Sequence, residues 1–382
     1  MTDGTITQST QNRISTSNYL TSSLLNEGAS IQGEWESCHR FSWISLYVKT
    51  TTIDKIGWLY VEFSRNKSDV TQKLGFRVMD NEFNKQLKCP VQNAYFRVTF
   101  TASNVLDQRT NPGNNNISDL EIHCMMHTEN PKAIFEIGKQ KVKMDGFDVS
   151  SGTKIPAFGL SLTMDNYPLP TSNQYVRIVN TSNDNGDYMS GGAAGTYLRT
   201  VLLIGVNDQL DEVYLKMSVK PANVSSGIET SSTQCMIRVN EFRMLTYGTA
   251  GKPYAYGSVT VQIYDGSYKS VIARYTNWGF KESTPVYYLP RNYGYGRITA
   301  VNYTGTNLAA QIYIHLNRSV GGTTTTLRHS EWIFNFMYLS CNPMHYPDGV
   351  VTSYGKPGDF YNVQFYAGTS VGINAEVEIE CG

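Results

Sequence analysis

Charge is scarce in this chain, and neither sign predominates. Charged residues make up 17% of the 382 residues, and 32 Lys and Arg side chains balance 32 Asp and Glu side chains. Proteins that bind nucleic acid or anionic membranes through their surface field carry a basic excess or a basic stripe. The composition therefore argues against nucleic acid as a partner and against electrostatic docking on a membrane.

Long apolar runs are also missing. The run VLLIGV at residues 201–206 is far shorter than the roughly 20 residues of a membrane-spanning helix. The N-terminal sequence MTDGTITQST contains neither the basic segment nor the apolar segment of a signal peptide. From these two absences we expect no membrane insertion and no export by a standard signal.

Cysteine is sparse and scattered. The chain has 6 cysteines, and none of them forms a C-x-x-C pair. A chain of this length can bury enough apolar surface to fold without a disulfide framework. We therefore expect free and mostly buried thiols at Cys38, Cys89, Cys124, Cys235, Cys341 and Cys381.

Helical periodicity is absent, whereas alternation with a period of two is frequent. Strand and turn formers, among them Tyr, Thr, Asn, Gly and Val, are abundant. The segments FSWISLYVKT (41–50), GWLYVEFSRN (57–66) and SDLEIHCMMH (118–127) place apolar side chains on one face. The predicted fold class is all-β, with tandem antiparallel β-sandwich or jelly-roll-like domains.

The pattern divides into four parts. We predict a flexible N-terminal arm at 1–18, a β-sandwich domain at 19–130, a second β-sandwich domain at 131–265 and a jelly-roll-like β domain at 266–382. A weak internal echo connects residues 44–66 with residues 298–319, because both have a strand, a short loop and a strand that ends in Asn and Arg. This echo favours two related sandwiches in one chain.

One motif resembles a catalytic signature. GTSVG at residues 368–372 matches the G-x-S-x-G pattern of a nucleophile elbow. Such an elbow requires a strand, a turn and a helix, with an acid and a His further along the chain. No His follows Ser370, and we interpret the motif as a Gly-rich hairpin turn.

Two groups of residues could suggest a metal. His123 and His127 share a face, but on a strand they lie about 13 Å apart, which is too far for one ion. Cys341, His345 and Asp348 lie close in sequence, but Pro343 and Pro347 make a rigid turn an equally good explanation. We predict no metal, no cofactor and no enzymatic activity.

Tyrosine is the remaining signal, with 26 residues. Two loops, 247–258 and 286–298, are dense in Tyr and Gly. Tyrosine offers a large rigid contact area with a polar tip, which suits contact with a protein or stacking on a sugar ring. The candidate contact surface consists of Tyr254, Tyr256, Tyr293 and Tyr295.

Two sets of segments resemble modules of virion structural proteins from large DNA viruses of algae and protists and from marine tailed phages. LRTVLLIGVN (198–207) and MIRVNEFRMLTYGTAG (236–251) resemble the family's "ARTV-I-GLD" and "FLRVNRAYVLTAG" segments. Residues 33–66, with 93–104 (NAYFRVTFTASN), resemble a virion β-sandwich module. The last region is similar to the C-terminal jelly-roll-like part of these proteins, so the resemblance covers most of residues 19–382.

This resemblance implies a non-enzymatic virion structural protein. The expected role is a minor capsid, penton or vertex-associated component of a large DNA virus that assembles through β-sandwich contacts. Its partners would be copies of itself and other virion proteins, and its location would be the virion, assembled in the host cell interior. The alternative is a phage tail, baseplate or fibre protein that binds a host-surface glycan.

Overall fold

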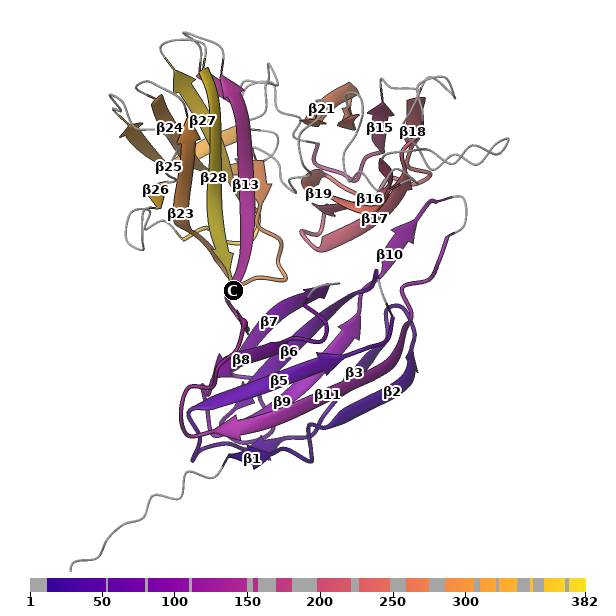
Figure 1. Ribbon diagram of the computed structural model, residues 1–382, viewed down its shortest axis with the longest axis vertical. Coiled ribbons are helices and arrows are strands. Elements are labelled where there is room, and N and C mark those ends of the chain that lie inside the picture. Colours follow the sequence, from indigo (N-terminus) through magenta and orange to yellow (C-terminus); the bar gives the residue numbers. More distant parts are fainter. Residues whose placement is uncertain are drawn as a thin grey trace, which may run out of the picture. The chain divides into compact units, whose positions relative to one another are not determined.

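The computed structural model describes the chain from residue 12 onward, with gaps (Figure 1). The described residues are 12–52, 54–79, 82–109, 112–149, 154–156, 170–180, 198–220, 227–247, 259–274, 286–305, 310–320, 323–334, 344–345, 354–367 and 371–382. In this part of the chain the regular elements are β-strands, and the sheets pack as sandwiches. The predicted all-β class is confirmed.

The chain forms two compact units. The first contains the residues up to Asn104 together with Asn114–Gln140 and Gly382, and the second contains Val105–Gly113 and Lys141–Cys381. The chain therefore leaves the first unit after Asn104 and re-enters it at Asn114. The short strand β10 (Val105–Asp107) lies in this excursion and belongs to the second unit.

The first unit is a sandwich of two sheets. One sheet has the order β1-β11-β5-β8-β12, with β2 also paired to β11, and the other has the order β3-β9-β6-β7, with β4 paired to β9. The strands are β1 (Arg13–Ile14), β2 (Leu20–Leu25), β3 (Ser30–Gln32), β4 (Glu36–Ser37), β5 (Trp43–Lys49), β6 (Ile56–Ser64), β7 (Gln72–Met79), β8 (Gln86–Pro90), β9 (Tyr95–Ala102), β11 (Ile117–His127) and β12 (Phe135–Glu136).

This strand order defines a jelly roll. If β2, β3, β5, β6, β7, β8, β9 and β11 are counted in chain order, with β4 continuing β3, one sheet reads 1-8-3-6 and the other reads 2-7-4-5. This arrangement of two four-stranded layers is the jelly-roll topology. The first strand of the domain thus pairs with its last strand, β2 with β11.

The core of the first jelly roll follows the alternation in the sequence. On β11 the inward side chains Leu120, Ile122, Cys124 and Met126 are buried, and they belong to the same apolar cluster as Phe96 of the facing sheet. Burial of each such large apolar side chain contributes roughly 1.5–3 kcal/mol relative to exposure. The residues of β11 and β5 that alternate with these buried residues lie on the outer face of the sheet.

The predicted arm at 1–18 is wrong for residues 13–18, which belong to the first sandwich. Residues 1–11 lie outside the described residues, but Arg13 and Ile14 pair with Met126 and Met125 of β11. Ser15 and Asn18 are fully buried. The polar composition of this segment suggested an arm in water. The polar side chains are instead buried with hydrogen-bond partners: the Asn18 Oδ1 accepts a hydrogen bond from the Val98 amide at 2.8 Å.

The second unit contains a jelly roll of the same topology. Its two sheets have the orders β13-β28-β23-β26 and β14-β27-β24-β25, which in chain order within this domain again read 1-8-3-6 and 2-7-4-5. The strands are β13 (Gln140–Val149), β14 (Lys154–Pro156), β23 (Gly296–Gly305), β24 (Ala310–Val320), β25 (Thr323–Phe334), β26 (Met344–His345), β27 (Asp359–Ala367) and β28 (Val371–Cys381). Figure 1 shows β13, β28 and β23 side by side in this order.

The internal echo in the sequence falls on equivalent strands. Residues 44–66 span β5 and β6, and residues 298–319 span β23 and β24. These are the third and fourth strands of their respective jelly rolls. The prediction of two related sandwiches in one chain agrees with this topology.

A further β module is inserted between β14 and β23 of the second jelly roll. It has one sheet of order β10-β17-β16-β19 and one of order β18-β15-β20-β21, and a shared core that includes Val176, Leu203, Phe242 and Val261. Its strands are β15 (Val176–Asn180), β16 (Leu198–Val206), β17 (Glu212–Ser218), β18 (Ile228–Thr230), β19 (Arg238–Tyr247), β20 (Val259–Asp265) and β21 (Ser267–Arg274). The next strand, β22 (Val286–Tyr288), pairs with β27 of the jelly roll.

The predicted boundaries at 130 and 265 differ from this arrangement. The first unit extends to Gln140, and the boundary at 265 falls inside the β20–β21 hairpin, in which Asp265 faces Ser267. The strands β13 and β14, which we expected in the second domain, join the C-terminal sheets. Local patterns identify strands, but they do not show that a strand pairs with a partner far along the chain.

The GTSVG motif also differs from its interpretation. The flanking strands β27 and β28 lie in different sheets, so the segment connects two sheets and does not close a hairpin. Residues 368–370, including Ser370, lie outside the described residues. A strand, β28, follows the motif where a nucleophile elbow has a helix.

The cysteines described by the structure agree with the sequence prediction. Five of them are free and buried, namely Cys38, Cys89, Cys124, Cys235 and Cys381. Burial raises the pKa of Cys38 and of Cys235 to about 12. Thiols with such a pKa are protonated and unreactive at neutral pH. Cys341 lies outside the described residues.

Candidate functional site

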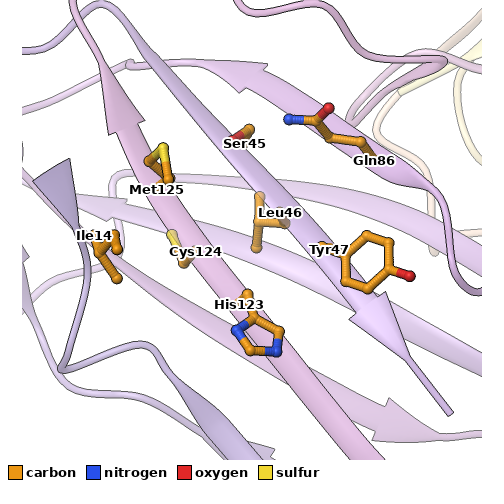
Figure 2. Close-up of a pocket in the computed structure, with 8 residues that line it drawn as sticks. All are labelled: Ile14, Ser45, Leu46, Tyr47, Gln86, His123, Cys124 and Met125. Atoms are coloured by element: carbon orange, nitrogen blue, oxygen red, sulfur yellow. The ribbon is translucent and has the colours of Figure 1, made fainter. Parts of the chain in front are cut away.

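The outer face of one sheet of the first jelly roll carries a hollow of about 410 Å³. Residues from four strands line it (Figure 2). Figure 2 shows Met125 and His123 along β11, with Ser45 and Tyr47 along the neighbouring strand β5. The full lining consists of Ile14, Ser45, Leu46, Tyr47, Gln86, His123, Cys124 and Met125.

Strand register places these residues in two rows across the sheet. Tyr47 of β5 lies between Gln86 of β8 and His123 of β11. One step along the strands, Ser45 lies opposite Met125, and Met125 lies opposite Ile14 of β1. Because side chains on alternate positions of a strand point the same way, both rows face outward.

Three aromatic side chains form an exposed cluster at one end of the hollow. The His123 ring lies 5.0 Å from the Tyr19 ring and 6.4 Å from the Tyr47 ring, measured between ring centroids. Tyr19 is 48% exposed, Tyr47 is 37% exposed and the His123 side chain is 49% exposed. We refer to Tyr19, Tyr47 and His123 as the aromatic cluster.

Charged side chains lie next to the aromatic cluster on the same outer face. The His123 Nε2 lies 3.1 Å from the Glu121 Oε2, and the Lys49 Nζ lies 3.2 Å from the Glu121 Oε1. Hydrogen bonds from His123 and Lys49 lower the pKa of Glu121, so this carboxylate is ionised at neutral pH. The face thus offers an anionic acceptor and a cationic donor beside three rings.

A buried polar pair adjoins the floor of the hollow. The Ser45 Oγ and the His127 Nε2 lie 2.7 Å apart, and both residues are buried. Burial lowers the pKa of His127, so its ring is neutral at neutral pH. The pair engages the Ser45 hydroxyl and one ring nitrogen of His127.

Of the four tyrosines predicted as a contact surface, only Tyr293 and Tyr295 are among the described residues. Tyr254 and Tyr256 lie outside the described residues. Tyr293 is only 1% exposed, and its amide donates a hydrogen bond to the Pro290 carbonyl at 3.2 Å. Tyr293 is therefore a core residue, and the prediction for it was wrong.

Tyr295 is partly exposed. Its hydroxyl donates a hydrogen bond to the Glu380 Oε1 at 3.3 Å, and its ring lies 5.6 Å from the ring of Tyr354, which is 59% exposed. The Arg297 Nε also donates to this Glu380 oxygen, at 2.9 Å. Tyr295 keeps some contact area, but its polar tip is already paired.

The two groups of residues that could suggest a metal differ in how much of each the structure describes. No group of three or more His, Cys, Asp or Glu side chains within the described ranges could hold a metal ion. His123 and His127 lie on one strand and have separate partners, Glu121 and Ser45. Cys341 and Asp348 lie outside the described residues, and His345 is placed only as part of β26.

Sequence reasoning missed the aromatic cluster for a specific reason. The alternation of residues 41–50 and 118–127 places Tyr47 and His123 on the faces opposite the apolar stripes of their strands. It did not show that β5 and β11 are neighbours in the register that places Tyr47 opposite His123. Tyr19 was outside consideration because it adjoins the segment interpreted as an arm.

Two further observations bear on what the protein is. Within the described ranges, no helix has the length and apolar character needed to cross a membrane. Comparison with models of known protein families and with curated proteins finds no match for this chain.

Proposed function

We propose that this chain is a non-enzymatic structural protein of a virus particle, acting as a minor capsid, penton or vertex-associated component of a large DNA virus. The observation that carries the proposal is the presence of two jelly rolls with the same strand order in one chain. The jelly roll is typical of viral capsid proteins and of lectins. A fold alone does not define a function, so the sequence resemblance described above is the second support.

The architecture suits a role in assembly. Each jelly roll presents outer sheet faces and sheet edges that another chain can contact. The outer face that carries the aromatic cluster in the first unit leaves large apolar side chains in water, among them Ile14, which is 67% exposed. Apolar surface of this kind marks contact sites on soluble proteins.

The proposal is tested by locating the protein in virus particles. Gradient-purified particles would be analysed by quantitative mass spectrometry beside the soluble fraction of the infected cells. We expect the chain to copurify with the particles at a fixed ratio to the major capsid protein. Its recovery only in the soluble fraction would overturn the proposal.

Light scattering of the purified chain at several concentrations distinguishes between the possible positions of the protein in the particle. A discrete trimer would favour a fibre, and a discrete pentamer would favour a vertex protein, because closed symmetric rings are the usual products of self-association. A monomer at all concentrations would indicate that other virion proteins supply the contacts, as for a minor cementing component.

The alternative is a tail, baseplate or fibre protein that binds a host-surface glycan. One observation favours it: the exposed aromatic cluster lies beside a hollow on the first jelly roll. The Tyr-rich loops named from the sequence do not favour it, since Tyr293 is buried.

A further inference from the structure

The hollow on the first jelly roll has the size of a small-ligand site. Its volume of about 410 Å³ falls within the roughly 300–1,000 Å³ that is typical of ligand pockets. Flat contact between two protein surfaces needs no such concavity. The lining is mainly apolar, with the outward side chains Ile14 and Met125 beside a few polar tips, and this composition is also typical of ligand pockets.

The chemistry around the hollow matches a sugar ring. A pyranose has apolar C–H faces, which pack on aromatic rings, and a rim of hydroxyl groups, which both donate and accept hydrogen bonds. The aromatic cluster supplies exposed rings, and Gln86, an exposed residue of the lining, supplies an amide with two donors and an acceptor. The Glu121 carboxylate and the Lys49 ammonium lie next to His123 on the same face.

Exposure of the cluster is the third argument. Tyr19 and Tyr47 keep 48% and 37% of their surface in water, although a Tyr ring gains by burial. Ile14, Tyr19 and Tyr47 are all on or beside this hollow, and all three are among the large apolar side chains that stay exposed. Such a group of exposed side chains around a concavity marks a binding site.

We propose that the outer face of β5, β8 and β11 in the first jelly roll binds a pyranose glycan, with a sugar ring seated against the aromatic cluster and its hydroxyls bonded to Gln86 and Glu121. The site is distinct from the Tyr-rich loops considered from the sequence. The inference does not depend on the position of the protein in a particle. Absence from particles would remove the virion proposal alone, and lack of glycan binding would remove this one alone.

The experiment uses the full chain on a glycan array that displays terminal galactose, mannose, N-acetylglucosamine, fucose and sialic acid. Glycans that bind are then titrated by calorimetry against the wild type and against Tyr47→Ala. We expect specific array signals, and at least about tenfold weaker binding by the variant. The matched control is Tyr264→Ala, because Tyr264 is 38% exposed and also contacts a second ring, Tyr268, at 5.3 Å.

A second variant guards against a fold defect in Tyr47→Ala. Gln86→Ala removes only the end of an exposed side chain, and we expect it to weaken binding while the thermal midpoint stays unchanged. An array without signal overturns the inference. Equal binding by wild type, Tyr47→Ala and Gln86→Ala also overturns it, because the bound glycan would then lie elsewhere on the protein.

Discussion

Buried Asn side chains complete the backbone hydrogen bonding where strands end. Asn115 is 1% exposed. Its Nδ2 donates to the carbonyls of Ile56 at 2.8 Å and of Ser103 at 2.7 Å, and its Oδ1 accepts from the Ile56 amide at 3.1 Å. One side chain therefore bonds three backbone groups, of which the Ile56 carbonyl also accepts from the Ser103 amide at 3.0 Å.

Replacement of Asn115 by Ala should destabilise the first unit strongly. Three backbone groups each lose a hydrogen bond to the Asn115 side chain, and we expect the free energy of unfolding to fall by about 3 kcal/mol. Urea unfolding measures this change. The control is Asn130→Ala at an exposed position, which should change stability by less than about 0.5 kcal/mol. Equal effects of the two substitutions would contradict the role assigned to Asn115.

Two glycines of the inserted module should respond differently to replacement by Ala. A Cβ at Gly205 would lie 2.1 Å from the Arg238 carbonyl oxygen, and backbone cannot move aside. A Cβ at Gly266 would meet nothing within 4 Å, but its φ is +70°. We expect a loss of roughly 2–3 kcal/mol for Gly205→Ala and about 1 kcal/mol for Gly266→Ala, measured by thermal unfolding. The reverse order would contradict the assigned contacts.

His127 should make the first unit sensitive to acid. Burial lowers the pKa of this ring in the folded protein, so the unfolded chain binds more protons below its ordinary pKa of about 6.5. The contribution of His127 to stability is complete above that pH and decreases as the pH falls through the window between the unfolded and folded pKa. Urea midpoints at pH 7.5 and pH 5.5 should differ less in His127→Gln than in the wild type. If the two urea midpoints differ as much in His127→Gln as in the wild type, groups other than His127 cause the acid sensitivity.

At the scale of elements, β10 completes a sheet of the inserted module. It pairs in parallel with β17, with Val105 beside Tyr214 and Asp107 beside Lys216. The Gln108 side chain extends the contact: its Nε2 donates to the Ser232 Oγ at 2.9 Å, and its Oε1 accepts from the Ser232 amide at 2.7 Å. Without β10, one edge of β17 would lose its partner strand.

Replacement of Val105–Gln108 by a Gly-Ser segment of equal length should expose that edge. We expect faster amide hydrogen exchange in Tyr214–Lys216, because these residues lose their neighbouring strand. Exchange in β6 of the first unit should stay unchanged, since β6 pairs with β7 and β9. Uniform acceleration across the whole chain would instead indicate global destabilisation.

The inserted module is attached to the second jelly roll by a similar side-chain pairing. Asn240 of β19 is fully buried, its Nδ2 donates to the Tyr288 carbonyl at 2.7 Å, and its Oδ1 accepts from the Tyr288 amide at 2.9 Å. The Tyr288 ring packs on Phe360 of β27 at 4.5 Å. The strand β22 thus connects the core of the module with the jelly-roll sheet.

At the scale of the whole molecule, two compact units should give two unfolding transitions. Each unit has its own sheets and its own buried core, and separate cores unfold as separate cooperative bodies. Differential scanning calorimetry should resolve two transitions, of which Asn115→Ala lowers only one. A single transition displaced as a whole by that substitution would show that the two units unfold together.

The limits of sequence reasoning are clearest at this scale. Strands such as 198–206 and 212–218 were recognisable because the pattern that defines them is local, and the turn at Asn207 was recognisable by its residues. The pairing of β13 with β28 was not recognisable from the sequence, because the entire inserted module lies between these two strands in the chain. Tyr293 shows the same limit for a site: its residue type suggested a surface position, whereas the folded protein leaves it only 1% exposed.

The pairing of first and last strands has a consequence for how the chain matures during its synthesis. In each jelly roll the first strand pairs with the eighth, which is synthesised last: β2 pairs with β11, and β13 pairs with β28. For the second jelly roll this means that β13 stays without its partner until Val371–Cys381 leave the ribosome. The inserted module has all its strands available earlier and can fold first, and closure of so long a loop adds a further entropic cost. The second jelly roll can therefore be completed only after β28 has been synthesised. A truncated chain that lacks β28 would leave β13 and β23 without the strand that pairs with both of them.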